Sequence, residues 1–234
     1  MLDVIREFDI PRFLARTPLF WGVAGPDLER LAGGCQLRRF CRGELVLQMG
    51  EPCHAFHIVV SGRVKLYVLS TSGNEKVVDV ISPGGTFAEA LMFLNRPSAV
   101  NAQALADTLL VTVQREAVLD ELQRDSNFAL SMLAGMSMRL HGLVQDVQAN
   151  ALQSGAQRVI GYLLRDQEGD GAEGGITVSL PVSKATVASL LSLTPEYFSR
   201  VLRELESARL IRVDKRNIHV LDIQRLAAYQ VCQA

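Results

Sequence analysis

The hydrophobic pattern of this 234-residue chain changes its period near Arg115, and this change limits the possible folds more than any other feature. Before it, short apolar runs such as residues 56–60 and 64–69 are separated by glycines at intervals of about 7–12 residues. Turns spaced in this way between β-branched runs are typical of an antiparallel barrel or sandwich. After it, apolar residues recur at helical spacing. We therefore predict an α+β chain in which a β-domain precedes a set of helices.

The helical part begins with a long amphipathic segment that contains no proline between about residues 127 and 150. Its apolar residues are spaced 3, 4, 3 and 4 and form an a/d stripe. The stripe consists of Leu133, Met136, Leu140, Leu143 and Val147. It could pack against its own β-domain, but the opposite side is polar and a narrow stripe fits a coiled coil better. We therefore predict that this stripe is the seam of a homodimer.

The C-terminal part combines a strand at 176–180, two short helices from about Ser183 and Pro195, and a hairpin. The hairpin joins residues 210–213 to 218–221 through a polar turn at 214–217. Helix, tight turn, helix and β-wing form a winged helix-turn-helix, a DNA-binding motif. The predicted organisation is a β-domain with N-terminal helices at 1–125, a dimerisation helix at 126–152 and a winged helix-turn-helix at 153–234.

The second helix of the motif carries the most chemical information. Thr194 can cap it with its hydroxyl, and Pro195 fits the first helical position. Apolar residues at i, i+3, i+4 and i+7 form a face that packs on the domain, namely Phe198, Val201, Leu202 and Leu205. A different face carries Glu196, Ser199, Arg200 and Arg203 at the same spacing.

This polar face suits the major groove of DNA. Arginine pairs bidentately with guanine, glutamate accepts from cytosine N4, and serine can serve either strand. We therefore predict that Glu196, Ser199 and Arg200 read bases. Other cations are assigned to phosphates, which set register rather than sequence. They are Arg203, Lys184, Arg209, Lys215 and Arg216. The alternative is a solvated charged face with a Glu196–Arg200 ion pair, and the surrounding helix, turn and wing favour DNA.

The net charge of −1, from 24 basic and 25 acidic side chains, does not by itself indicate a nucleic-acid partner. The charge is uneven, however, because residues 200–216 contain six basic and three acidic side chains. A local basic patch attracts phosphates, whereas total charge mainly governs solubility. Double-stranded DNA is thus the expected partner.

The segment 195–200 resembles the E-x-x-S-R signature of the Fnr branch of the Crp/Fnr transcription regulators, and the likeness covers nearly the whole chain. This resemblance implies a cyclic-nucleotide-binding-type β-roll as sensor domain, a long dimerisation helix and a winged helix-turn-helix. It also implies RNA polymerase as a partner and a TTGAT-like half-site read by Glu196, Ser199 and Arg200. The glycine common in the turn of this family is Ser192 here, which is tolerable if the turn does not require a positive φ.

The resemblance also bears on the effector. Glu89 matches the ribose-contacting carboxylate of relatives that bind cyclic AMP, but the position of their phosphate-binding arginine falls on Pro97 or Ser98. Arg96 stands one or two residues early. A buried cyclic phosphate without its arginine loses a charge-assisted, bidentate contact, so we do not expect cyclic AMP to bind. The sensor pocket is assigned to Phe87, Glu89, Met92 and Ser98.

Residues 87–93, together with His54-Ala55-Phe56, resemble most closely the Dnr subgroup, which is associated with nitric oxide, haem and denitrification genes. This resemblance implies a nitric oxide or redox sensor with haem as cofactor. The candidate axial ligands are His54, His57, His141, Met92 or a cysteine. None of the histidines has a metal-spaced partner, so ordinary surface or core roles remain open for them.

Other classes of protein receive no support from the sequence. The cysteines Cys35, Cys41, Cys53 and Cys232 form no C-x-x-C pair, so free thiols are expected rather than an iron–sulfur cluster. There is no run of eighteen apolar residues and no basic N-terminus followed by an apolar stretch, so we expect no membrane segment and a cytoplasmic protein.

An enzymatic role is not expected either. A β-roll enzyme requires a metal-spaced His/Glu set or a nucleophile with its base, and the sequence contains neither. Two alternatives to the regulator described above remain open. One is a cyclic-nucleotide-responsive regulator, and the other is a β-roll module of another signalling protein.

Overall fold

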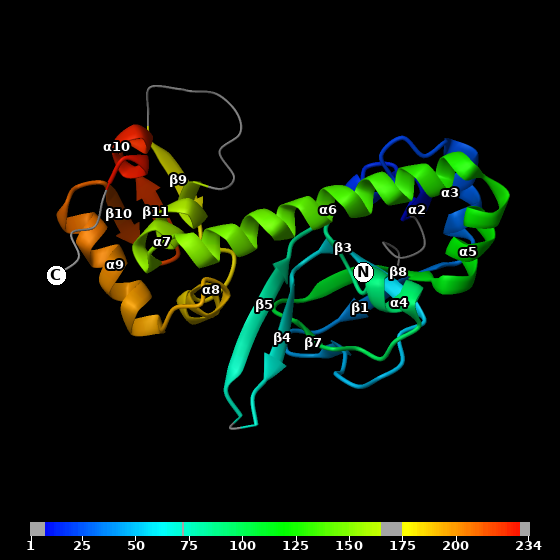
Figure 1. The fold of residues 1–234 in the computed structure, drawn as a ribbon, viewed down its shortest axis with the longest axis horizontal. Coiled ribbons are helices and arrows are strands. Elements are labelled where there is room, and N and C mark those ends of the chain that lie inside the picture. Colours follow the sequence, from blue (N-terminus) through cyan, green and yellow to red (C-terminus); the bar gives the residue numbers. More distant parts are fainter. Residues whose placement is uncertain (1–7, 72, 165–174, 230–234) are drawn as a thin grey trace. The chain divides into compact units, whose positions relative to one another are not determined.

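The structure is a computed structural model that describes residues 8–71, 73–164 and 175–229. It divides into two compact units (Figure 1), one ending at Gly142 and the other beginning at Leu143. The boundary lies within helix α6 (Ser126–Leu152), so one continuous helix contributes residues to both units. This helix occupies the range in which the sequence predicts a dimerisation helix. None of the described helices is long and apolar enough to cross a membrane.

The part of the first unit that the structure describes is built on eight strands. They are β1 (Cys35–Phe40), β2 (Leu45–Leu47), β3 (Ala55–Ser61), β4 (Val64–Leu69), β5 (Glu75–Ile81), β6 (Thr86–Phe87), β7 (Asn101–Ala104) and β8 (Thr108–Gln114). The strands form two four-stranded antiparallel sheets, in the orders β1-β8-β3-β6 and β2-β7-β4-β5. Buried side chains of both sheets, among them Phe40, Val64 and Leu110, form one cluster. The predicted β-roll is therefore present.

The helices of this unit cover one face of the sheet that contains β3 and β8. They are α2 (Ile10–Leu14), η1 (Pro18–Phe20), α3 (Gly25–Ala32), α4 (Glu89–Leu94), α5 (Arg115–Arg124) and the first part of α6. Successive side chains of a strand point to opposite faces. Accordingly, Phe56 and Ile58 of β3 belong to the cluster beneath the helices, whereas Val59 belongs to the cluster inside the roll.

Helix α6 is anchored in the first unit by its initial turns. Phe128 is fully buried and stacks on Phe20 of η1, with 6.4 Å between the ring centroids, and Phe20 in turn contacts Phe56 of β3. Met132, one turn later, is also buried in this cluster. Burying a side chain of this size contributes about 1.5–3 kcal/mol. The start of α6 is thus part of the core of the first unit.

A second face of α6 is exposed and apolar. Leu133, Leu140, Leu143 and Val147 of the predicted seam are all exposed, Leu140 by 63%. The exposed stripe also includes Leu130 and Val144. Met136 differs from the prediction, because it is half-buried against the unit's own core. The reason is that it lies one turn after the buried Met132, on the same side of the helix.

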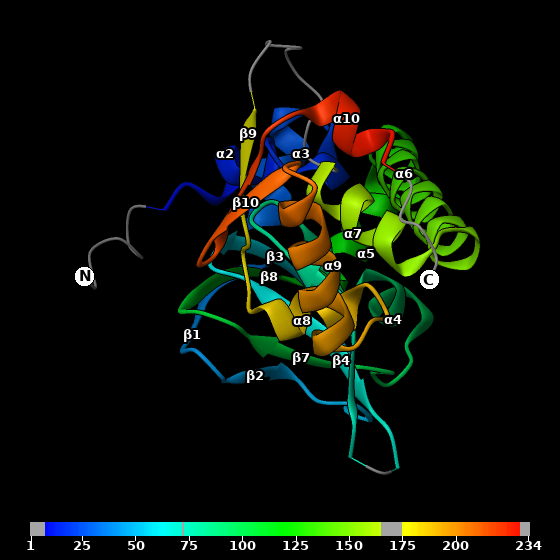
Figure 2. The same ribbon diagram turned by 90° about the vertical axis from the view of Figure 1, so that its left-hand side faces the viewer.

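Within residues 143–164 and 175–229, the second unit contains a small sheet and four helices after α6. Its elements are α7 (Gly155–Leu164), β9 (Ile176–Ser179), α8 (Lys184–Leu190), α9 (Pro195–Ser207), β10 (Ile211–Asp214), β11 (Asn217–Val220) and α10 (Ile223–Ala227). Helices α8 and α9 pack together across a tight turn (Figure 2), and the strands form an antiparallel sheet in the order β10-β11-β9. The predicted winged helix-turn-helix, and with it the predicted α+β architecture, is confirmed.

Two turns of this unit differ from the sequence prediction. The wing strands extend to Asp214 and Asn217, which pair, so the turn consists only of Lys215 and Arg216. Two-residue hairpin loops with a positive φ match the twist of the strands, and Lys215 has a φ of 54°. Ser192 also has a positive φ, of 57°. The turn between α8 and α9 therefore does require the left-handed conformation, which costs a residue other than glycine about 1 kcal/mol.

Two glycines of α6 test how closely the helix approaches η1. A Cβ at Gly135 would lie 2.9 Å from the carbonyl oxygen of Leu19, whereas a Cβ at Gly142 has no atom within 4 Å. We expect Gly135→Ala to lower the melting temperature, because backbone atoms must shift to admit the methyl group. Gly142→Ala should instead raise the free energy of unfolding by up to about 1 kcal/mol through helix propensity. Thermal denaturation followed by circular dichroism measures both, and a stabilised Gly135→Ala variant would contradict the close contact.

Candidate nucleic-acid interface

Helix α9 has the start and the packed face that its sequence predicts. The Thr194 hydroxyl accepts a hydrogen bond from the Tyr197 N–H at 3.2 Å, and Pro195 is the first helical residue. The apolar face is buried, and it consists of Phe198, Val201, Leu202 and Leu205. Glu196, Arg200 and Arg203 are exposed on the other side, and Ser199 is half-buried. The packed residues thus force the predicted base-reading face outward.

Two contacts fix the helix-turn-helix pair on its unit. The Ser183 hydroxyl accepts from the Thr186 N–H at 3.1 Å and caps α8. Arg158 of α7 donates from Nη1 to the carbonyl oxygen of Leu191 at 2.7 Å, directly before the turn. The turn is therefore attached to a third helix, and α9 has a defined direction relative to α7 and α8.

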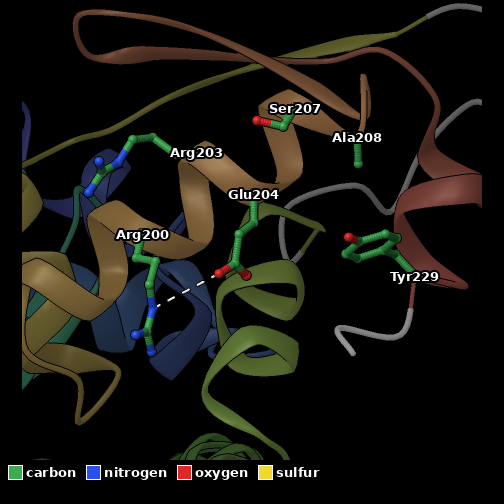
Figure 3. A pocket seen from close by; sticks show the side chains of 6 residues that line it. All are labelled: Arg200, Arg203, Glu204, Ser207, Ala208 and Tyr229. Carbon is green, nitrogen blue, oxygen red and sulfur yellow. Dashed lines mark ion pairs between the residues drawn. The ribbon is translucent and has the colours of Figure 1, made fainter. Parts of the chain in front are cut away.

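Arg200 makes two contacts within α9. Its Nε lies 3.9 Å from Oε1 of Glu204 (Figure 3). Its guanidinium carbon lies 4.8 Å from the centroid of the Tyr197 ring. The ion pair described for Arg200 is thus with Glu204, one turn later, and not the Glu196 pair considered as the alternative from the sequence. With side chains 61% and 43% exposed, such a pair contributes at most about 1 kcal/mol. Arg200 therefore stays available to a ligand.

Arg203 points away from α9 in a different direction from Arg200 (Figure 3). Its Nε donates to the carbonyl oxygen of Ser199 at 3.4 Å, and its side chain is exposed. A shallow depression lies beside both guanidinium groups. It is lined by Arg200, Arg203, Glu204, Ser207, Ala208 and Tyr229. This part of α9 thus offers two cations to an anionic surface.

The remaining predicted phosphate contacts lie on three different elements. Arg209 lies two residues after the end of α9 and has a φ of 54°, and Lys215 and Arg216 form the tip of the wing. These three side chains are exposed, whereas Lys184, the first residue of α8, is half-buried. The structure therefore presents cations on α9, just after its end and at the tip of the wing. Contacts to several phosphates of a DNA backbone require cations that are spread in this way.

Three residues that support this surface were missed by the sequence interpretation. Glu206 accepts a hydrogen bond from the Val213 N–H at 2.9 Å and fastens the wing to α9. Tyr197 and Glu204 contact Arg200 from positions i−3 and i+4. Helical spacing could have revealed the two partners of Arg200, but no local signal points to the contact between Glu206 and the wing.

The residues assigned to a sensor pocket do not share one environment. Phe87 belongs to the cluster inside the roll, whereas Met92 belongs to the cluster beneath the helices. Glu89 is buried and receives a hydrogen bond from the Thr86 hydroxyl. Ser98 is buried too, and its hydroxyl donates to the carbonyl oxygen of Val100 at 2.7 Å. The polar groups are thus engaged within the chain.

The three candidate haem-ligating histidines also differ in environment. His57 is buried inside the roll, where its Nδ1 lies 3.0 Å from the Thr112 hydroxyl and its ring packs on Phe87. Burial, followed by the charge of Arg38, lowers the pKa of His57 to about 4. This ring is a neutral core side chain, and haem ligation by it would require the roll to open. His54 and His141 are exposed.

The described cysteines have the properties of ordinary thiols rather than those of metal or haem ligands. Cys35, Cys41 and Cys53 are free, and Cys232 lies outside the described residues. Burial raises the pKa of Cys35 to about 12 and also raises the pKa of Cys53. Within residues 8–71, 73–164 and 175–229 there is no group of three or more His, Cys, Asp or Glu side chains placed to hold a metal ion.

Comparison with known proteins places both units in one family. Residues 37–125 match the cyclic nucleotide-binding domain, and residues 157–229 match the Crp-like helix-turn-helix domain. The chain is 35% identical to DNR from Pseudomonas aeruginosa, over 96% of this chain and 100% of that one, with a TM-score of 0.54. FixK2 from Bradyrhizobium japonicum shares the fold, with a TM-score of 0.73 at 23% identity, over 86% of this chain and 99% of that one.

A second relative also matches over nearly the full length. The chain is 24% identical to the CRP-like cAMP-activated global transcriptional regulator of Mycobacterium tuberculosis, over 92% of this chain and 96% of that protein. These relatives are regulators and not enzymes, which supports the prediction of a non-enzymatic role. By its two domains, its fold and its identity to a full-length relative, the chain belongs to the Crp/Fnr family of DNA-binding transcription regulators.

Proposed function

We propose that this regulator binds, as a homodimer, a palindromic site with TTGAT-like half-sites, and that Glu196, Ser199 and Arg200 read the bases. The observation that carries this proposal is the outward polar face of α9, whose opposite face is fully packed. A transcription regulator acts on promoters, so RNA polymerase is the proposed protein partner.

Two interaction energies favour the movement of the Arg200 side chain from Glu204 to a base of DNA. Its ion pair with Glu204 is solvent-exposed and contributes at most about 1 kcal/mol. A bidentate pair with guanine O6 and N7 contributes about 1–3 kcal/mol of discrimination. The exchange therefore favours the base, while the exposed cations at Arg203, Arg209 and the wing tip supply attraction to phosphates that does not depend on sequence.

The exposed stripe of α6 supports the proposed homodimer. A helix of a monomeric protein usually turns its apolar side inward, yet Leu133, Leu140, Leu143 and Val147 are exposed. The same stripe on a second copy is its natural complement, because a/d residues interdigitate in a coiled coil. Two linked DNA-binding units also match the two-fold symmetry of a palindromic operator.

For the effector we propose nitric oxide or a redox signal, received through haem, rather than cyclic AMP. Against cyclic AMP, the chain places no arginine at the phosphate-binding position, and Ser98 directs its hydroxyl to a backbone carbonyl. Haem is what the resemblance of residues 87–93 to the Dnr subgroup implies, and the chain is 35% identical to DNR. Of the candidate ligands, the exposed His54 and His141 could reach haem at the surface, whereas His57 and Met92 are buried.

A cyclic-nucleotide-responsive regulator is the second candidate. It is favoured by the match of residues 37–125 to the cyclic nucleotide-binding domain and by a 24% identical relative that is named as cAMP-activated. Glu89 also lies at the position of the ribose-contacting carboxylate. The absent arginine makes this the second candidate rather than the first, because an unpaired buried phosphate is costly.

Base reading is tested by two arginine variants. Arg200→Ala should remove discrimination between a TTGAT operator and one in which the guanine is replaced, a loss of about 1–3 kcal/mol. Arg203→Ala should weaken binding to both operators alike and reduce the slope of log K against log salt concentration by about 1. Fluorescence anisotropy with labelled duplexes measures both effects. Unchanged discrimination in Arg200→Ala would remove the role assigned to this residue.

The seam is tested by the double variant Leu140→Asp/Leu143→Asp. We expect monomers with greatly weakened operator binding, since carboxylates cannot be buried unpaired in a coiled coil. Met138→Asp is the matched control, because Met138 is exposed on α6 but lies off the stripe. Light scattering measures the mass in solution, and a double variant that remains dimeric would show that the stripe is not the seam.

The effector is tested by absorption spectroscopy of haem-reconstituted protein. We expect a Soret band that shifts on addition of nitric oxide and that changes in His54→Ala or His141→Ala. His219→Ala, in the DNA-binding unit, is the control and should leave the spectrum unchanged. A spectrum that no variant alters would indicate adventitious haem. Saturable binding of cyclic AMP in a calorimetric titration would favour the second candidate.

A further inference from the structure

We infer that Tyr197 is a positioning residue for Arg200, and that Gly155 provides the space in which the Tyr197 ring lies. The inference rests on the proposed base-reading role of Arg200. Tyr197 would contact no base itself. It acts on sequence discrimination by restricting the orientations of the guanidinium group that reads the guanine.

The first step is the contact between the ring and the guanidinium. Tyr197 is the third residue of α9 and is half-buried. The guanidinium carbon of Arg200 lies 4.8 Å from its ring centroid, within the range of a cation–π interaction. Residues three apart are neighbours on a helix surface. The ring is thus a platform beside a long, otherwise flexible side chain.

The second step is the contribution of Glu204, on the next turn. Glu204 approaches Nε of Arg200 to 3.9 Å, so the guanidinium has one partner at i−3 and one at i+4. The ion pair is exposed and weakly directional, whereas a ring offers a defined plane. A guanidinium that already lies against a plane loses less side-chain entropy when it pairs with a base. The Tyr197 ring therefore restricts the orientation of the guanidinium, whereas the Glu204 carboxylate only attracts its positive charge.

The third step is the position of the ring itself. A Cβ at Gly155, the first residue of α7, would lie 2.7 Å from Cε1 and 3.0 Å from Cζ of Tyr197, and 2.9 Å from Cδ2 of Leu193. The ring therefore lies directly against the backbone of α7, which any side chain at this position would prevent. Gly155, at the start of α7, thus determines the position of the Tyr197 ring that contacts Arg200.

A comparison within α7 separates this contact from the general cost of replacing glycine. A Cβ at Gly161, in the same helix, has only Oε1 of Gln153 nearby, at 3.8 Å. Neither glycine has a positive φ. Alanine at position 161 is therefore sterically free, whereas alanine at position 155 must displace the Tyr197 ring.

The test uses the full-length chain and two duplexes, one with TTGAT half-sites and one with TTAAT half-sites. The quantity measured is the ratio of the two dissociation constants. We expect Tyr197→Leu to reduce this ratio by roughly two- to fivefold, the size of an exposed cation–π contact. Tyr197→Phe should preserve the ratio, because it keeps the ring. In an Arg200→Ala background Tyr197→Leu should change the ratio no further.

The glycine variants give an independent readout that does not depend on altering Tyr197. Gly155→Ala should lower the ratio, whereas Gly161→Ala should leave it unchanged. Circular dichroism confirms that each variant is folded. Should Tyr197→Leu fail to fold, Gly155→Ala still decides the question, with Gly161→Ala as its control.

The outcomes separate the inference from the proposal on which it rests. If Arg200→Ala keeps the wild-type ratio, the base-reading role fails and the inference fails with it. If Arg200→Ala lowers the ratio of dissociation constants while Tyr197→Leu and Gly155→Ala leave it at the wild-type value, only the inference is overturned. Equal weakening of both duplexes by Tyr197→Leu would show a structural role alone and would also overturn it.

Discussion

The structure depends on the division of helix α6 into two faces. One face begins with Phe128 and Met132, which are buried among the helices and the β3–β8 sheet of the sensor unit. Gly135 lets the same face approach the backbone of Leu19. The other face remains apolar and exposed. A helix that served only its own core would not leave Leu140 63% exposed. The buried anchor in the first unit and the proposed dimer seam are therefore two sides of one helix.

The DNA-binding unit also depends on a helix with one packed and one exposed face. Helix α9 buries Phe198, Val201, Leu202 and Leu205, so its polar residues must point outward. The cap at Thr194 defines where the helix begins, and Arg158 ties the preceding turn to α7. An interface that reads bases needs this rigidity, because a bidentate hydrogen bond tolerates little misplacement. The positive φ of Ser192 shows that the tight turn is kept even at a conformational cost.

Much of the fold was predictable because it depends on local periodicity. The 3-4-3-4 spacing in α6 and the i, i+3, i+4, i+7 face of α9 are direct consequences of helix geometry. The wing and the β-roll follow from short strands and turn residues. The structure differs from the sequence predictions where contacts with residues outside a local pattern determine the environment of a side chain or the length of a turn. Met136 belongs to the stripe by spacing, but it follows the buried Met132 by one turn and packs on the core. The predicted wing turn was two residues too long, because Asp214 and Asn217 pair across it.

The sequence by itself determined the family, the order of the units and the polar face of the recognition helix, because periodicity, caps and the Glu-x-x-Ser-Arg motif are properties of short segments. Only the tertiary structure decided which groups are engaged with each other. It placed Phe87 and Met92 in different clusters, because adjacent elements of the roll face opposite sides of one sheet. It buried His57 against Phe87 and gave Arg200 its partners. Contacts such as that of Gly155 with Tyr197 join segments forty residues apart, and no local pattern encodes a distance between them.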